Sequence, residues 1–208
     1  MASILDLINT DKGSEFISKA MDKTGESNDT ITTTLGLALP VLIGAMKKNI
    51  QDEKGARELN SALNDPKHGK KFLDNLNHKN PSAITAEGGK ILGHVLGSNQ
   101  ENLNKTVAAK LGIKESSISD IIKMAAPLLM SVLANQKKEE KVEIAGLDKL
   151  MESVLGSSDK FDSSLISTFL DKNKDGSVID DISGMIFGGN NKSKKGKGGI
   201  FCGMLGGK

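Results

Sequence analysis

The strongest chemical pattern in the 208-residue chain is a run of oxygen-bearing side chains between residues 171 and 181. A calcium loop of the EF-hand kind needs oxygen ligands at positions 1, 3 and 5, glycine at position 6 and a main-chain carbonyl at position 7. Gly176 falls at the turn, so the pattern predicts Ca²⁺ as a cofactor. The candidate metal ligands are Asp171, Asn173, Asp175, Ser177 and Asp181.

The end of this loop departs from the calcium pattern. Position 12, where an EF-hand loop carries a bidentate Glu, is occupied by Ile182, and the nearest carboxylate is Asp181, one place early. The alternative is a polar turn between two helices, because Asp, Asn and Gly are also ordinary turn residues. The segment 161–187 is therefore a calcium-loop candidate with a weakened ligand set.

No other residue pattern indicates catalysis. The three histidines, His68, His78 and His94, are separated along the chain and lack neighbouring Cys or carboxylate ligands at metal-binding spacing. Cys202 is the single cysteine, which excludes an internal disulfide and a Cys-rich zinc site. Phosphate-loop, nucleophile-elbow and dinucleotide motifs are missing from the sequence. We therefore predict that the protein is not an enzyme.

Composition narrows the class of protein further. Lys and Arg number 28 against 26 Asp and Glu, and a net charge of +2 disfavours a general nucleic-acid binder. Aromatic residues make up 3% of the chain, with no Trp or Tyr, so the core must be aliphatic. The longest apolar run, residues 35–46, is too short to span a bilayer, and no basic leader precedes it. We expect a cytoplasmic protein without a transmembrane segment.

An internal repeat organises the elements ahead of the loop. Aligning Pro40 with Pro127 without a gap superimposes two apolar stripes with the spacing of a helix. The stripes are Ile31, Leu35, Ala38, Leu42, Ala45 and Met46 in the first copy and Ile118, Ile122, Ala125, Leu129, Val132 and Leu133 in the second. We expect an all-α multihelical bundle of two helix-turn-helix units, at about 3–49 and 90–138, whose long helices are kinked by proline.

The same alignment predicts helix caps in each unit. A short helix should end at a left-handed glycine, Gly25 or Gly112, before the long helix begins. The residues expected to cap the long helices are Asn28 or Asp29 in the first unit and Ser116 or Ser117 in the second.

Glycines also recur every four residues between the two units, at Gly89, Gly93 and Gly97. On a helix they form one smooth strip, although each costs about 1 kcal/mol relative to alanine. We expect another backbone to pack closely against this strip, with His94 as a polar residue at the same contact.

The chain ends in a tail at residues 188–208, after a helical domain at residues 1–187. The tail begins as a basic Gly/Lys-rich linker and closes with an apolar segment. It is either a disordered tail or a docking peptide that fills a groove in a partner. The apolar residues that would dock are Ile200, Phe201, Met204 and Leu205.

Several of these segments together resemble one bacterial family. They are residues 88–98, residues 125–129, the block at 39–44 and the loop at 171–177. The chain is similar there to the YidB-like proteins, a family of unknown function, over about residues 3–189. The resemblance implies an all-helical fold in a cytoplasmic bacterial protein, and it implies no activity.

The function expected from these observations is a structural or interaction protein that assembles with itself or docks to a partner protein. One alternative is a Ca²⁺-responsive binding protein that uses the Asp171–Asp181 loop. A weaker alternative is association with nucleic acid through the Lys-rich tail, without sequence specificity.

Overall fold

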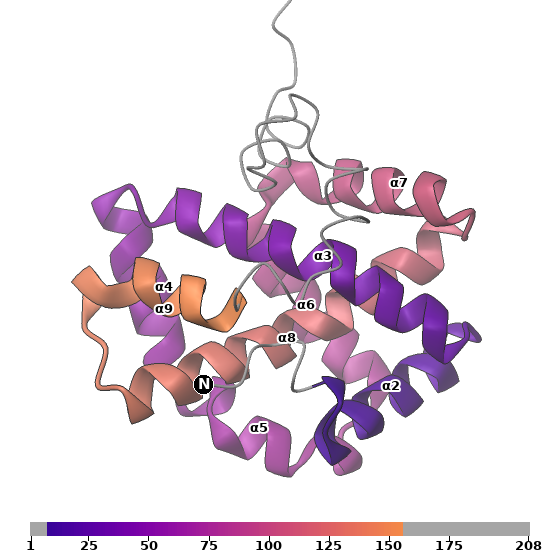
Figure 1. The fold of residues 1–208 in the computed structure, drawn as a ribbon, viewed down its shortest axis with the longest axis horizontal. Helices are drawn as coiled ribbons and strands as arrows, with labels where there is room; N and C mark the ends of the chain where they lie inside the picture. Colours follow the sequence, from indigo (N-terminus) through magenta and orange to yellow (C-terminus); the bar gives the residue numbers. More distant parts are fainter. Residues whose placement is uncertain (1–7, 156–208) are drawn as a thin grey trace, which may run out of the picture.

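The computed structural model describes residues 8–155 and shows an all-α fold, as expected (Figure 1). No strand occurs among the described residues. The calcium-loop segment 161–187 and the tail at 188–208 lie outside them. The α-helices are α2 (Asp11–Thr24), α3 (Asn28–Asn49), α4 (Glu53–Asn64), α5 (Lys70–Asp74), α6 (Pro81–Val95), α7 (Gln100–Leu111), α8 (Glu115–Glu139) and α9 (Leu147–Leu155). Short 3₁₀ turns are η1 (Pro66–His68), η2 (Leu76–His78), η3 (Gly97–Asn99) and η4 (Ile144–Gly146).

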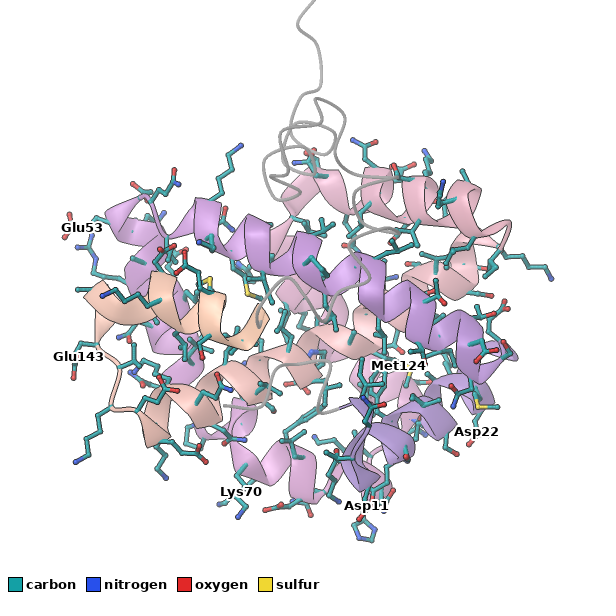
Figure 2. All side chains as sticks on the ribbon, viewed as in Figure 1. Asp11, Asp22, Glu53, Lys70, Met124 and Glu143 are labelled. Carbon is teal, nitrogen blue, oxygen red and sulfur yellow. The ribbon has the colours of Figure 1, made fainter. Side chains whose placement is uncertain are left out.

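Helix α8 is the central element of the bundle. It runs through the middle of the fold and contacts α2, α3, α4, α5, α6, α7 and α9 (Figure 1). Its apolar residues are buried on all sides, since Met124, Ala126 and Met130 are covered as well as the predicted stripe. A helix segment that is apolar all round belongs in a core, and Met124, labelled in Figure 2, is fully buried. The core is therefore largely aliphatic, as composition predicted, but Phe16 and Phe72 are also buried in it.

Helix α3 supplies the second large part of this core. Its predicted stripe is buried, and the run from Ala38 to Met46 is covered without interruption. Helices α3 and α8 are both long and apolar enough to cross a membrane by length and composition alone. However, 67% of the apolar window of α3 and 83% of that of α8 are buried inside the fold. Most of the apolar window of each helix therefore packs inside the fold.

The predicted C-caps of the two short helices are confirmed, but the predicted N-caps of the two long helices are not. Gly25 and Gly112 are left-handed C-caps with φ of +73° and +67°, as predicted. The predicted N-caps are wrong. Ser27 caps α3 by accepting a hydrogen bond from the Thr30 N–H at 3.2 Å, because its extended backbone aims the hydroxyl at the first turn. Helix α8 follows Lys114, which makes no side-chain cap.

The wrong N-caps have a common cause. Asn28 and Asp29 already lie within α3, and Ser116 and Ser117 lie within the first turn of α8. Both prolines lie inside uninterrupted helices, Pro40 in α3 and Pro127 in α8. A pseudo-symmetric repeat and a kink at each proline stay predictions.

A candidate interaction surface on helix α6

Helix α6 lies against the proline of α8. Pro127 has no N–H, so it donates no backbone bond to the carbonyl of Lys123 one turn earlier. Gly88 of α6 lies directly against that carbonyl: a Cβ atom at position 88 would overlap the Lys123 oxygen and lie 3.1 Å from the Lys123 Cα. The two backbones therefore meet at a glycine, where a Cα–H group can approach the carbonyl oxygen.

The glycines of the predicted strip do not take part in this close approach. Gly89 and Gly93 have no protein atom within 4 Å of a Cβ placed on them, among the described residues. Gly97 lies beyond the end of α6, in η3, and its φ of +57° gives it a local reason to be glycine. Gly88, on the buried side of the helix, contacts the backbone of α8, and a backbone contact at the strip itself stays a prediction.

The buried side of α6 explains this arrangement. Its buried residues are Ile84, Gly88, Leu92 and Val95, which follow each other at helical spacing. The residues one position later, Gly89 and Gly93, are half-buried and exposed respectively. The signal for Gly88 was therefore present in the sequence, as a glycine in register with two large apolar residues.

The opposite side of α6 forms a surface of small residues, which we call the α6 outer face. It consists of Ser82, Ala83, Ala86, Gly89, Lys90, Gly93 and His94. All of these residues are exposed except Gly89, which is half-buried. His94 thus lies on this outer face, where the sequence placed it beside the glycines.

The end of α6 is held in place by α3. The Asn49 Nδ2 donates to the main-chain carbonyl of Val95 at 3.1 Å. Because the last carbonyls of a helix have no partner within the helix, this bond fixes the end of α6 against α3. Together with the contact at Gly88, it gives the α6 outer face a rigid frame.

The other predicted site residues are not brought into this surface by the structure. The calcium ligands (Asp171, Asn173, Asp175, Ser177 and Asp181) and the apolar tail residues (Ile200, Phe201, Met204 and Leu205) lie outside the described residues. Within residues 8–155, no group of three or more His, Cys, Asp or Glu side chains could hold a metal ion. The calcium loop and the docking tail stay predictions.

A second feature was not predicted from the sequence at all. The polar stretch between α4 and α6 folds into η1, α5 and η2, and these elements border a hollow of about 600 Å³. We call it the lysine hollow, because Lys67, Lys71 and Lys79 line it together with Phe72, Asn75 and Glu87. The sequence does contain a cluster of lysines in residues 67–79, but their spacing did not show that three of them line one hollow.

His68 lies in η1, next to the lining residue Lys67, and its side chain is buried. It is 5% exposed, and its Nδ1 has no hydrogen-bond partner in the described part of the chain. The nearest carboxylate oxygen is Glu87 Oε1, 3.8 Å from that nitrogen. Burial lowers the pKa of His68, with a further lowering from the charge of Lys67, against opposing effects of Glu87 and Asp65.

The lowered pKa of His68 predicts a loss of stability in mild acid. Above the ordinary histidine pKa the side chain is neutral in both folded and unfolded states, and the full stability is present. As the pH falls through that value toward the lowered folded pKa, the unfolded state binds more protons and the free energy of unfolding decreases. We expect the urea midpoint to drop between pH 7.5 and 5.5, and to drop less in His68→Gln. An equal drop in parent and variant would contradict this, and His78→Gln, at an exposed histidine, is the matched control.

The described residues form an all-α bundle around the central helix α8. Residues 6–136 match the family model described as "Bacterial protein of unknown function (DUF937)". Since the match covers more than half of the chain, the protein belongs to this bacterial family, and the helices from α2 to most of α8 are the family's part of it. No curated protein and no solved structure is similar enough to the chain to count as a match.

Proposed function

We propose that the protein is a non-enzymatic interaction module whose α6 outer face packs against another polypeptide chain, with a second copy of the protein as the partner. Within its family, we place it with the YidB-like proteins on the segments at 39–44, 88–98 and 125–129. The observation that carries the proposal is the pair Gly89 and Gly93: among residues 8–155, no protein atom lies within 4 Å of a Cβ placed at either position.

The argument rests on the cost of these glycines. Glycine inside a helix is about 1 kcal/mol less favourable than alanine. At Gly88 this cost has a structural reason, because no side chain fits against the Lys123 carbonyl. Gly89 and Gly93 have open space in the described chain and could carry alanine without any clash. A contact with an external backbone would give them a reason that the chain's own fold does not give.

The shape and chemistry of the α6 outer face suit such a contact. Small residues recur on this face at intervals of three or four residues, so they form one continuous row along the helix, which we call the track. These residues are Ser82, Ala86, Gly89 and Gly93. A second helix can come closer to small residues than to large ones, and this favours dispersion and Cα–H···O contacts. Lys90 is the charged residue of the face, and its ammonium group would form an ion pair with a carboxylate of the partner helix.

The proposal predicts that filling the track abolishes assembly without harming the fold. We expect the parent chain to show a mass above 22.0 kDa that rises with concentration in multi-angle light scattering. The double variant Gly89→Leu/Gly93→Leu should keep its helical content and stay at the monomer mass, because leucine holds the partner backbone away.

The control for this experiment enlarges an exposed residue on another helix. Thr33 is exposed on α3, so Thr33→Leu adds apolar surface of similar size away from the α6 outer face. It should assemble as the parent does. A parent chain that stays monomeric at every concentration, or a double variant that assembles normally, would refute the proposed contact.

A further inference from the structure

The lysine hollow carries an excess of positive charge. Its charged lining residues are Lys67, Lys71 and Lys79, against a single carboxylate in the lining, Glu87. Asp65 pairs with Lys67 from just outside the lining. Lysine side chains thus outnumber carboxylates in this concave region, and such a region attracts anions.

Two of these lysines lack a counter-charge. Lys67 pairs with Asp65 at 3.0 Å, so its charge is largely balanced. For Lys71 and Lys79, no carboxylate among residues 8–155 comes within 4.0 Å of the ammonium group. The Lys79 Nζ instead lies 5.1 Å from the centre of the Phe72 ring, where the ring face attracts a cation. The like charges repel one another, and a bound anion would relieve that repulsion.

The backbone that carries these lysines is firmly anchored. Phe72 is 2% exposed and Leu76 is fully buried, so α5 and η2 are fastened to the core on both sides of the hollow's lining. From α2, the Lys19 Nζ donates to the main-chain carbonyls of Asn77 at 2.9 Å and Lys79 at 3.0 Å. The Asn75 Nδ2 donates to the Lys71 carbonyl at 2.8 Å. Positions that are fixed before binding reduce the entropy lost when a ligand arrives.

From this geometry we infer that the lysine hollow binds a small molecule carrying a phosphate group. The hollow is an open surface depression of about 600 Å³, so a ligand would lie with one side toward solvent. A phosphate is doubly charged near neutral pH and matches the excess of charge better than a monocarboxylate does. Lys71 and Lys79 would hold the phosphate as point charges. Glu87 and Asn75 would accept hydrogen bonds from hydroxyl groups elsewhere on the ligand.

Phosphate chemistry can come from a soluble ester or from a lipid headgroup, and the experiment separates the two. The full-length protein is titrated with glycerol 3-phosphate while amide and lysine side-chain NMR signals are followed, and chloride is added at the same ionic strength as a reference. In parallel, sedimentation with phosphatidylglycerol vesicles tests the headgroup on a membrane surface. We expect saturable shifts centred on residues 67–79, with a dissociation constant at least tenfold higher in Lys71→Gln/Lys79→Gln.

The control removes the same charge from other elements. Lys114 and Lys149 are exposed and lie outside the hollow, so Lys114→Gln/Lys149→Gln should bind as the parent does. Saturable binding of the soluble ester supports a metabolite site, and binding of vesicles alone supports a headgroup site. Absence of both, or an equal loss of affinity in the two double variants, would overturn the inference, because the effect would then be one of net charge.

Discussion

Replacing Gly88 with alanine is expected to destabilise the fold by about 3 kcal/mol or more, whereas the same change at Gly89 should stabilise it by up to about 1 kcal/mol. The two residues are adjacent on one helix, and both changes add a single methyl group. At Gly88 the new Cβ would overlap the Lys123 carbonyl oxygen, which is a main-chain atom and cannot rotate away. At Gly89 the methyl group enters open space, and only the better helix propensity of alanine remains.

Urea denaturation of the two variants, followed by circular dichroism, measures these opposite changes in the free energy of unfolding. A fold worth about 5–15 kcal/mol can lose a large share of its stability at Gly88, so Gly88→Ala should unfold at a clearly lower urea concentration than the parent. Gly89→Ala should unfold at an equal or higher one. If both variants moved in the same direction, the contact between Gly88 and Lys123 would not be the tight point of the α6–α8 packing.

The sequence allowed the large helices of this fold to be predicted because their signals are local. Ile118 and Ile122 lie on an apolar stripe of helical period, and both are fully buried in α8. Gly25 and Gly112 were predicted as C-caps because a left-handed residue after a helix strongly favours glycine. Such features depend on residues close in the chain, and a single sequence records them directly.

Features that depend on neighbouring elements were predicted less well. The spacing drew attention to Gly89 and Gly93, but the sequence did not show that Gly88 faces the backbone of α8. That contact depends on Pro127, which is 39 positions along the chain, and on the carbonyl that this proline leaves without its usual donor. The burial of His68 is a second feature of this kind, because η1 packs against α4, α5 and α8, and α8 is distant in the chain.

Truncating Phe72 to alanine is expected to cost about 3–5 kcal/mol and to release the segment that borders the lysine hollow. Phe72 is 2% exposed and is the only fully covered large side chain of the short helix α5. A helix of five residues has almost no stability of its own, so α5 depends on this ring for its attachment to the core. The loss should therefore appear both as a lower urea midpoint and as faster hydrogen exchange in residues 67–79.

The conservative variant Phe72→Leu separates packing from ring chemistry. Leucine keeps most of the buried apolar volume but removes the ring face beneath the Lys79 ammonium, 5.1 Å from the ring centre in the parent. We expect Phe72→Leu to lose about 1 kcal/mol, within the range of volume-conserving core changes, and to retain slow exchange in α5. If Phe72→Ala left exchange in residues 67–79 unchanged, another contact would hold this segment. The anchored frame on which the convergence of Lys71 and Lys79 depends would then have a different origin.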